Sequence, residues 1–517
     1  MSPSSRIVLN TAIMYCRYIF TAVVTLFSAR WVLLALGEIN FGVFSLIAGM
    51  LAILMFLNLS MSTTTQRFLS NAYGKNDESL IKRIFSHSII LHSITAIVIF
   101  TLIETVGFFL LKNFLTVPIE KMDDAFFILH CLTISCFISI FTAPFNAALI
   151  AHENMLFVSI IQITESILKF LTALTLLHYD GNRLKLYAIL MMAIPIISSL
   201  GYILYCQKKY IECHFSIPKK INFGLLKEMS SFFGFSLIGW LGTLLKTQGL
   251  AMLLNSFFGV LVNAAYGIAN QINGQLLFVS NAVYGAARPQ IIRNESENNH
   301  QRMLELSESV CKITFLIFAT IAVPLCFEIH QILELWLKQI PAYTESFAII
   351  TICANTIAMI ANGVTISIEA VGNIKLYQII VSTLHLLVIP FALVMLKLNY
   401  GATAVLTVVI VEEIGSGIAK LIIAKHITGL NIRQMVKKTI IPSIFLVFMC
   451  TLATWLICKL FEESFIRLIF VFLTNFLLIP SLSYILVLTE KEKNVVSRIL
   501  TKMLNKIGLV KSKRSCT

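Results

Sequence analysis

The feature that most constrains this chain is a series of apolar runs of about twenty residues, such as 41–61, 128–150, 440–458 and 465–488. A helix needs about twenty apolar residues to cross the hydrocarbon core of a bilayer. No long run alternates apolar and polar residues, as the strands of a membrane barrel would. Only 13% of the residues are charged, about half the share of a typical soluble domain. The chain is therefore expected to be an all-α polytopic membrane protein.

The apolar runs divide into about fourteen predicted transmembrane helices. Their approximate bounds are 7–29, 40–61, 84–111, 125–150, 155–177, 185–206, 229–247, 260–287, 311–333, 344–371, 375–397, 402–424, 439–459 and 465–488. The first run contains Arg17 and lacks a small-residue cleavage pattern, so it is expected to be a retained span. The outer loops are short, whereas the inner segments 62–83, 207–228 and 288–310 are longer and amphipathic. No soluble domain is expected.

Positive charge is distributed unevenly between the predicted loops. With the N-terminus inside, 27 of the 40 Lys and Arg residues fall in cytoplasmic segments, ten outside and three within spans. This asymmetry follows the positive-inside rule and accounts for the net charge of +14 without a nucleic-acid partner. It predicts a multi-pass protein of the bacterial inner membrane with both termini in the cytoplasm. The basic tail is expected to lie against anionic lipid.

An internal repeat predicts two similar halves. The matched positions are Gly37 with Gly259, Asn76 with Asn294 and Asn154 with Asn373, with offsets close to 220. The offset carries the first span onto the seventh, and because six spans is an even number both halves enter the membrane in the same direction. The pseudo-two-fold axis that relates them is then expected along the membrane normal.

The predicted organisation follows from this repeat. We expect an N-terminal six-helix bundle at 1–215, a C-terminal six-helix bundle at 216–430, two additional transmembrane helices at 431–490, and a basic cytoplasmic tail at 491–517. Two bundles that face each other across a central cleft are suited to alternating access.

Polar residues at helical spacing predict which faces line that cleft. In the first span, Arg17, Thr21 and Thr25 fall on one side, and the eighth span has a similar stripe. The candidate substrate-binding residues are Arg17, Thr21, Thr25, Arg30, Lys246, Gln248, Asn263, Asn270, Gln271, Asn281 and Arg288. Small and amide residues can equally serve helix packing, and Arg30 and Lys246 could reach the interface from span ends. Arg17 either lines the cavity or pairs with an intramembrane glutamate.

Carboxylates within spans are candidates for coupling to protons or cations, because burying them in a membrane is costly. Glu104, Glu165 and Glu369 are the coupling candidates, and Glu412 and Glu413 are of the same kind. Glu165 is also expected to pair with Lys169 four residues later. The cysteines form no C-x-x-C pair, and neither a disulfide, a metal site nor a cofactor is expected.

Arginines in an amide-rich cleft favour a particular ligand chemistry. A guanidinium stays charged and binds phosphate through two parallel hydrogen bonds. A lipid pyrophosphate that carries a sugar chain needs such an anion site, with amide-rich walls for its hydroxyls. The Asn and Gln residues of the eighth span suit a sugar better than an apolar cation.

Several motifs in the chain resemble those of polysaccharide flippases of the O-antigen type, within the multidrug/oligosaccharidyl-lipid/polysaccharide exporter superfamily. They are Gly37-x-x-x-Phe-Gly42, Gln66 to Lys75, Ala143 to Met155, Gln248 to Gly259, Asn263 to Gln271, and Arg288-Pro-Gln-Ile291. The resemblance covers roughly residues 8–430. It implies a two-bundle fold with a cavity between spans 1, 2, 7 and 8, and transfer of undecaprenyl-pyrophosphate-linked oligosaccharide to the outer leaflet. It also implies contact with polysaccharide polymerase or glycosyltransferases.

Two other functions are open. A cation-coupled multidrug exporter of the same superfamily, driven by H⁺ or Na⁺, would share the fold and differ in the cavity. A membrane glycosyltransferase or O-antigen polymerase would need a sizeable outer loop or an acidic motif. The only acidic doublet in the longest outer loop is Asp123-Asp124, without a D-x-D companion. A transporter is therefore expected rather than an enzyme.

Overall fold

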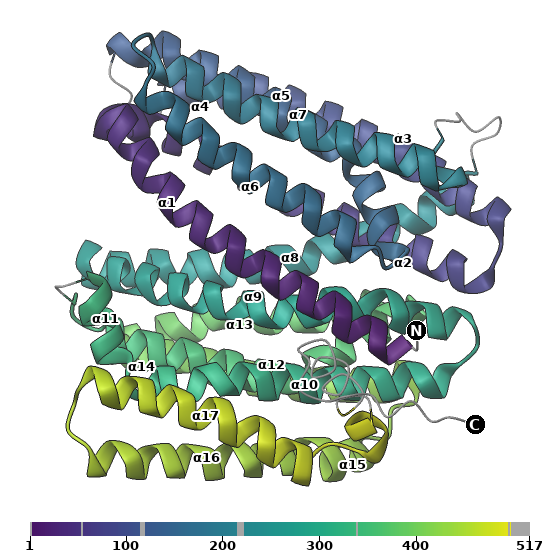
Figure 1. Ribbon diagram of the computed structural model, residues 1–517, viewed down its shortest axis with the longest axis vertical. Coiled ribbons are helices and arrows are strands. Elements are labelled where there is room, and N and C mark those ends of the chain that lie inside the picture. Colours follow the sequence, from purple (N-terminus) through teal and green to yellow (C-terminus); the bar gives the residue numbers. More distant parts are fainter. Residues whose placement is uncertain are drawn as a thin grey trace, which may run out of the picture. The chain divides into compact units, whose positions relative to one another are not determined.

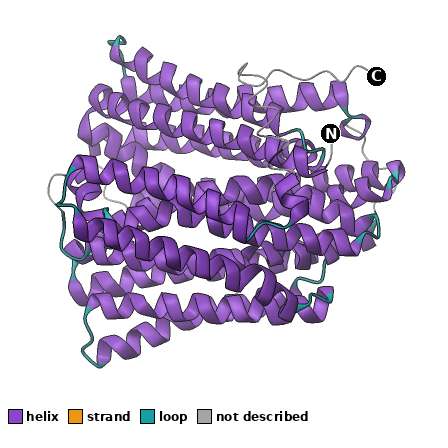
Figure 2. Ribbon diagram, turned by 60° about the horizontal axis from the view of Figure 1, so that its bottom comes forward, coloured by secondary structure: helices purple, strands orange, loops and turns teal. Residues whose placement is uncertain are grey.

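The computed structural model describes residues 3–52, 55–113, 119–214, 222–337, 340–494 and Ser497. Within these ranges the chain is helical and contains no β-strand (Figure 2). Each of the fourteen predicted spans overlaps a helical segment of the described chain; the span at 40–61 includes residues 53–54, which lie outside it. Ten helices of the described chain are long and apolar enough to cross a membrane. The prediction of an all-α polytopic membrane protein is confirmed.

The first half of the chain contributes seven α-helices. They are α1 (Pro3–Ala52), α2 (Met55–Lys75), α3 (Glu78–Leu102), α4 (Phe108–Asn113), α5 (Met122–Ala151), α6 (Met155–Leu177) and α7 (Arg183–Lys209). A π-helical turn at Ile103–Gly107 joins α3 to α4, and short 3-10 turns lie at Ile119–Lys121 and Ile211–Cys213.

The second half contributes ten α-helices (Figure 1). They are α8 (Phe223–Phe258), α9 (Val260–Ser296), α10 (His300–Phe327), α11 (Ile329–Leu337), α12 (Thr344–Val371), α13 (Lys375–Lys397), α14 (Ala402–Thr428), α15 (Ile432–Met435), α16 (Ile441–Leu460) and α17 (Phe465–Leu486). A π-helical turn at Val436–Ile440 joins α15 to α16.

Several helices begin at a polar side chain that accepts the hydrogen bond of a backbone N–H left free in the first turn. Asn154 caps α6, Asn182 caps α7, and Ser464 caps α17 in this way. Such caps stabilise a helix start by about 1 kcal/mol. They explain why the short polar loops between apolar runs suffice to separate the spans.

The contacts of the chain define two compact units. One, here called the N-unit, comprises residues 10–240 and 292–300; the other, the C-unit, comprises 1–9, 241–291 and 301–517. Each has its own apolar core: Ile47, Ile128 and Leu129 are fully buried in the N-unit, and Leu254 and Phe347 in the C-unit. The two-fold relation expected between the halves stays a prediction.

Backbone conformation supports the internal repeat. The chain adopts a positive φ at three pairs of equivalent positions: Gly37 (73°) and Gly259 (83°), Asn76 (52°) and Asn298 (58°), and Glu153 (60°) and Gly372 (94°). A positive φ is unusual for any residue but glycine, so three matched pairs are informative. Their offsets are 222, 222 and 219. The partner of Asn76 is therefore Asn298, and the expected match to Asn294 is wrong by one helical turn.

The two last spans, α16 and α17, are fixed to the C-unit by a buried ion pair. Arg467 of α17 donates from Nε to Glu328 Oε1 and from a terminal nitrogen to Glu328 Oε2, both at 2.9 Å. Glu328 lies between α10 and α11 and is 1% exposed. After α17, Glu492 accepts hydrogen bonds from Ser309 and from the buried Lys312 of α10.

Candidate functional site

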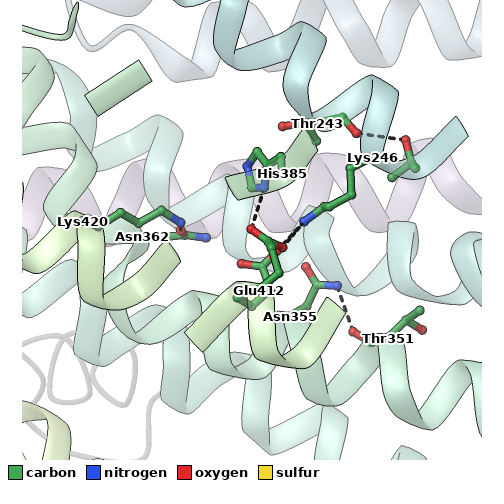
Figure 3. Close-up of polar contacts among 10 residues, drawn as sticks. Thr243, Lys246, Thr351, Asn355, Asn362, His385, Glu412 and Lys420 are labelled. Atoms are coloured by element: carbon green, nitrogen blue, oxygen red, sulfur yellow. Dashed lines mark hydrogen bonds and ion pairs between the residues drawn. The ribbon is translucent and has the colours of Figure 1, made fainter. Parts of the chain in front are cut away.

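The densest group of buried charges in the described chain lies in the C-unit and joins α8, α13 and α14 (Figure 3). Lys246 Nζ donates to Glu412 Oε2 at 2.9 Å and to Glu413 Oε1 at 2.7 Å. His385 Nδ1 lies 2.8 Å from Glu412 Oε1. All four residues are at most 9% exposed. We call Lys246, His385, Glu412 and Glu413 the charged cluster.

Glycines bring α8 close enough to α13 for these contacts. A Cβ at Gly242 would lie 2.9 Å from Ser382 Cβ, and one at Gly249 would lie 2.6 Å from Ile389 Cδ1. Both glycines share a helix face with Lys246, at i−4 and i+3. The absence of side chains at these two positions therefore allows Lys246 to reach the acidic residues, and the expectation that it could extend to the interface is wrong.

A second lysine extends the cluster along α14. Lys420 Nζ donates to Asn362 Oδ1 of α12 at 2.8 Å and is 5% exposed. Figure 3 shows this pair to one side of the contact between Lys246 and Glu412. Seven residues separate Lys420 from Glu413, a rise of about 10 Å along a helix. Lys420 thus adds positive potential to the cluster without a direct bond to either acid.

The donor atoms of His385, Glu412 and Glu413 lie within 4.8 Å of one another, a spacing that could hold a metal ion. The ammonium of Lys246 already contacts both carboxylates, however. A metal ion would have to displace this ammonium or be repelled by it. With Lys246 in place, the residues do not fit a metal ion.

Two candidates from different predicted roles form an ion pair with each other. Arg288 of α9, expected to bind substrate, donates from Nε and a terminal nitrogen to Glu369 Oε2 of α12, expected to serve coupling. The side chains are 24% and 15% exposed. Each therefore compensates the charge of the other, and neither is an isolated intramembrane charge.

The remaining predicted coupling residues lie in the N-unit and are less buried. Glu104 lies 2.7 Å from His130, whose side chain is half exposed. The expected pair of Glu165 with Lys169 is wrong, since no salt bridge joins them and Lys169 is exposed. The orientation at i,i+4 permits such a pair but does not impose it, because a lysine in a span can extend away from the helix.

Arg17 is 4% exposed and lies in the N-unit. Its guanidinium carbon lies 4.1 Å from the centre of the Tyr18 ring, a cation–π contact. Within the described chain no carboxylate reaches salt-bridge distance of Arg17, so the alternative of a pair with Glu104 or Glu165 is wrong. Thr21 bonds the carbonyl of Tyr18 and Thr25 is exposed. The side chain of Arg30 lies outside what the structure describes.

The predicted amide stripe of α8 and α9 is partly accessible. Gln248, Gln271 and Asn281 are exposed, whereas Asn263 and Asn270 are half-buried. A Cβ at Gly267 or Gly274 would meet no described atom within 4 Å. Helix packing therefore does not account for these two glycines, in contrast to Gly242 and Gly249.

Sequence reasoning missed His385 and did not place Lys246 beside the acids. A lone histidine in an apolar helix gives no signal by itself. The adjacent Glu412 and Glu413 within a span were visible, and the need to compensate two buried charges pointed to a basic partner without identifying it.

Solved structures similar to this one are transporters, whereas no family model and no curated protein matches the sequence. A mutant MATE transporter superposes with a TM-score of 0.75 at 15% identity, over 83% of this chain and 97% of the other. The MATE transporter ClbM in complex with Rb⁺ gives 0.69 at 15%, over 84% and 96%. A MOP superfamily transporter from Pyrococcus furiosus, described as having a binding pocket of reverse polarity, gives 0.67 at 13%, over 83% and 96%. The chain has a MATE-like transporter fold.

Proposed function

We propose that this chain is a cation-coupled exporter of the bacterial cytoplasmic membrane. The observation that carries the proposal is the charged cluster of the C-unit, in which two carboxylates, a lysine and a histidine are buried together. Buried charges in a membrane protein are costly and mark ion or proton pathways. A coupling step needs such a group, because its charge must change during the transport cycle.

The similar structures support a multidrug substrate. One of them is an outward-facing multidrug resistance MATE transporter with a TM-score of 0.68 at 14% identity. The reverse pocket polarity described for the Pyrococcus furiosus protein indicates that one fold can serve different functions. An exporter of organic cations is therefore the first candidate. In that case the accessible polar residues of α9 must accept a largely apolar cation.

A lipid-linked oligosaccharide is the second candidate, and Arg17 favours it. A guanidinium that is buried without a carboxylate at salt-bridge distance in the described chain is an anion site. Organic cations would be repelled by it, whereas a pyrophosphate would be bound. The exposed amides Gln248, Gln271 and Asn281 offer hydrogen bonds to sugar hydroxyls. On this reading contact with polysaccharide polymerase or glycosyltransferases is also proposed.

The experiment is transport by the purified protein in proteoliposomes with imposed H⁺ or Na⁺ gradients. Ethidium represents the first substrate class and undecaprenyl-pyrophosphate-linked oligosaccharide the second. The double change Glu412→Gln with Glu413→Gln is expected to abolish gradient-driven transport. The matched control is Glu462→Gln, an exposed glutamate between α16 and α17. Gradient-driven transport that survives the double change refutes the proposed coupling role.

Sidedness is part of the proposal. The distribution of positive charge over the loops supports a topology with both termini in the cytoplasm, in which Asp123 is outside and Lys511 inside. Single cysteines at these two positions, introduced in a chain without its other cysteines, should be labelled by an impermeant maleimide from opposite sides of the membrane. Labelling of both from the outside contradicts the topology.

A further inference from the structure

Lys246 occupies the place that a cation would take in the charged cluster. Its ammonium lies 2.9 Å from an oxygen of Glu412 and 2.7 Å from one of Glu413, and its side chain is only 8% exposed. The close approach of α8 and α13 at Gly242 and Gly249 holds this lysine inward. A positive charge is thus covalently attached at the point where the two carboxylates converge.

His385 supplies the group that can change charge. Nδ1 lies 2.8 Å from Glu412 Oε1, and since an ionised carboxylate can only accept, Nδ1 donates its hydrogen to it. Nε2 then carries the lone pair, and it forms no hydrogen bond within the described chain. His385 contacts Glu412 of α14, which shares the ammonium of Lys246 with Glu413. The groups that act on this cluster from the neighbouring helices are Tyr266 of α9 on Lys246, Tyr377 of α13 on Glu413, and Lys420 of α14 on both carboxylates.

The charges of the cluster favour one added proton. With a neutral His385, two carboxylates and one ammonium in direct contact leave a net charge of −1. A proton on Nε2 brings the four residues to neutrality, which is the least costly state for a buried group. Adding a metal cation instead would place it against the ammonium of Lys246. Lys420 acts on both carboxylates and opposes a proton and a metal cation alike, so direct contact with the Lys246 ammonium is what separates the two cases.

We infer that Lys246 is a tethered substitute for a coupling metal ion, so that the charged cluster exchanges a proton on the His385–Glu412 pair and excludes alkali cations. This inference rests on the proposed coupling role of the cluster. Uptake adds one proton to Nε2 without any other change in bonding, and release returns it. The imidazolium then competes with the ammonium of Lys246 for the carboxylate of Glu412, which weakens the bond between α8 and α14.

The inference predicts that removing the tethered charge creates a metal site. The experiment compares the thermal unfolding of the full-length protein in NaCl, RbCl and choline chloride at equal ionic strength. The wild type should not distinguish these salts. Lys246→Met leaves two carboxylates and a histidine unopposed, and its Tm should rise by about 2 °C or more in NaCl or RbCl over choline. Lys459→Met, which removes a lysine that lies over Trp455, is the control and should behave as the wild type.

A second measurement does not depend on whether Lys246→Met folds. Acidification of the wild type should bind about one proton more per molecule than the same acidification of His385→Gln, measured with a pH indicator. A wild-type protein that is stabilised by Na⁺ or Rb⁺, but not after Glu413→Gln, overturns the inference, and so does equal proton uptake by the two proteins.

These readouts also separate the inference from the proposed function. Neither measures transport, so they can succeed when no substrate is exported. Loss of gradient-driven transport in the glutamine double variant, together with Na⁺ stabilisation of the wild type, would support coupling and refute the tethered lysine.

Discussion

The two units share a backbone pattern but differ in their charges. Positive φ values recur at equivalent positions of both halves, at Gly37 and Gly259 for example. The charged cluster has no such counterpart: with the repeat offsets, Lys246, His385, Glu412 and Glu413 correspond to Val24, Ser166, Ala193 and Ile194. Conversely, Arg17 corresponds to Gly239. The repeat therefore determines where helices bend and end, whereas ionisable chemistry is specific to each half.

This difference assigns separate tasks to the two units under the proposed function. The C-unit holds compensated charges that can bind and release a proton. The N-unit holds a buried guanidinium with no carboxylate at salt-bridge distance in the described chain, as an anion site requires. The predictions below test this division.

The largest effect on stability is expected at the ion pair between Glu328 and Arg467 in the C-unit. Arg467 belongs to α17, a helix that has no counterpart in the repeat. Glu328→Ala removes both carboxylate oxygens that accept from Arg467 and leaves a buried guanidinium without its acid, which should lower the free energy of unfolding by about 3–5 kcal/mol. Glu463→Ala is the matched control, because Glu463 lies 3.7 Å from the same arginine but is 64% exposed. Denaturant or thermal unfolding in detergent measures both. Equal losses in the two variants would show that the buried pair does not fix α17.

In the N-unit, Arg17→Ala should leave abundance and Tm unchanged or raised, because no described carboxylate loses its partner. If Arg17 anchors a pyrophosphate, flipping of the lipid-linked oligosaccharide should fall by about 100-fold, the loss expected when a bidentate charged contact is removed. Arg17→Lys should retain part of the activity, since an ammonium cannot form both bonds. Lys169→Ala, at an exposed lysine of the same unit, serves as the control. Normal abundance with normal flipping excludes Arg17 from this role.

A smaller effect on stability is expected at Gly372 and Glu153, two equivalent positions of the repeat that carry different residues. Gly372 and Glu153 both have positive φ. Gly372→Ala should cost about 1 kcal/mol, because alanine is strained there. Glu153→Gly should change stability by less than about 0.5 kcal/mol, since the relief of strain and the added flexibility of the unfolded chain offset each other. Thermal unfolding in detergent measures both, and similar costs for the two changes would contradict the equivalence of these positions.

The smallest effect concerns a polar contact after α7 in the N-unit. Burial raises the pKa of Glu212, but hydrogen bonds from His152 and Tyr73 lower it more, so the pKa lies below its ordinary value. The stabilisation is therefore present above the ordinary pKa of glutamate, about 4.3, and is lost as pH falls through the lowered value. Glu212→Gln should unfold at a lower temperature than the wild type at about pH 7, and the difference should shrink towards about pH 4. A constant difference would assign the effect to packing.

The fold was largely predictable because each span depends on a local property of the sequence. Runs of about twenty apolar residues form helices whatever their partners are. The bends at Gly37 and Gly259 were visible only as a repeated motif, since φ cannot be read from a single glycine.

The site was less predictable because it depends on distant contacts. Glu412 and Glu413 were conspicuous within a span, yet Lys246, the partner of Glu412, lies 166 residues away. Arg288 and Glu369 were each recognised, for different roles, and only the structure shows that they pair. His385 had no signal in sequence, because its significance comes entirely from the carboxylate beside it.

The positive φ values at equivalent positions of the two halves also bear on how the chain evolved. Tandem duplication of a half-length gene with six spans preserves the direction in which each copy enters the membrane, because the number of spans is even. The first product would have been symmetric, with the same residues on both sides. A lysine in the second copy, at the position equivalent to Val24, and an arginine in the first copy, at the position equivalent to Gly239, then suffice to begin a division of labour. The shared bends would record the ancestor, and the unmatched charges would record the later specialisation.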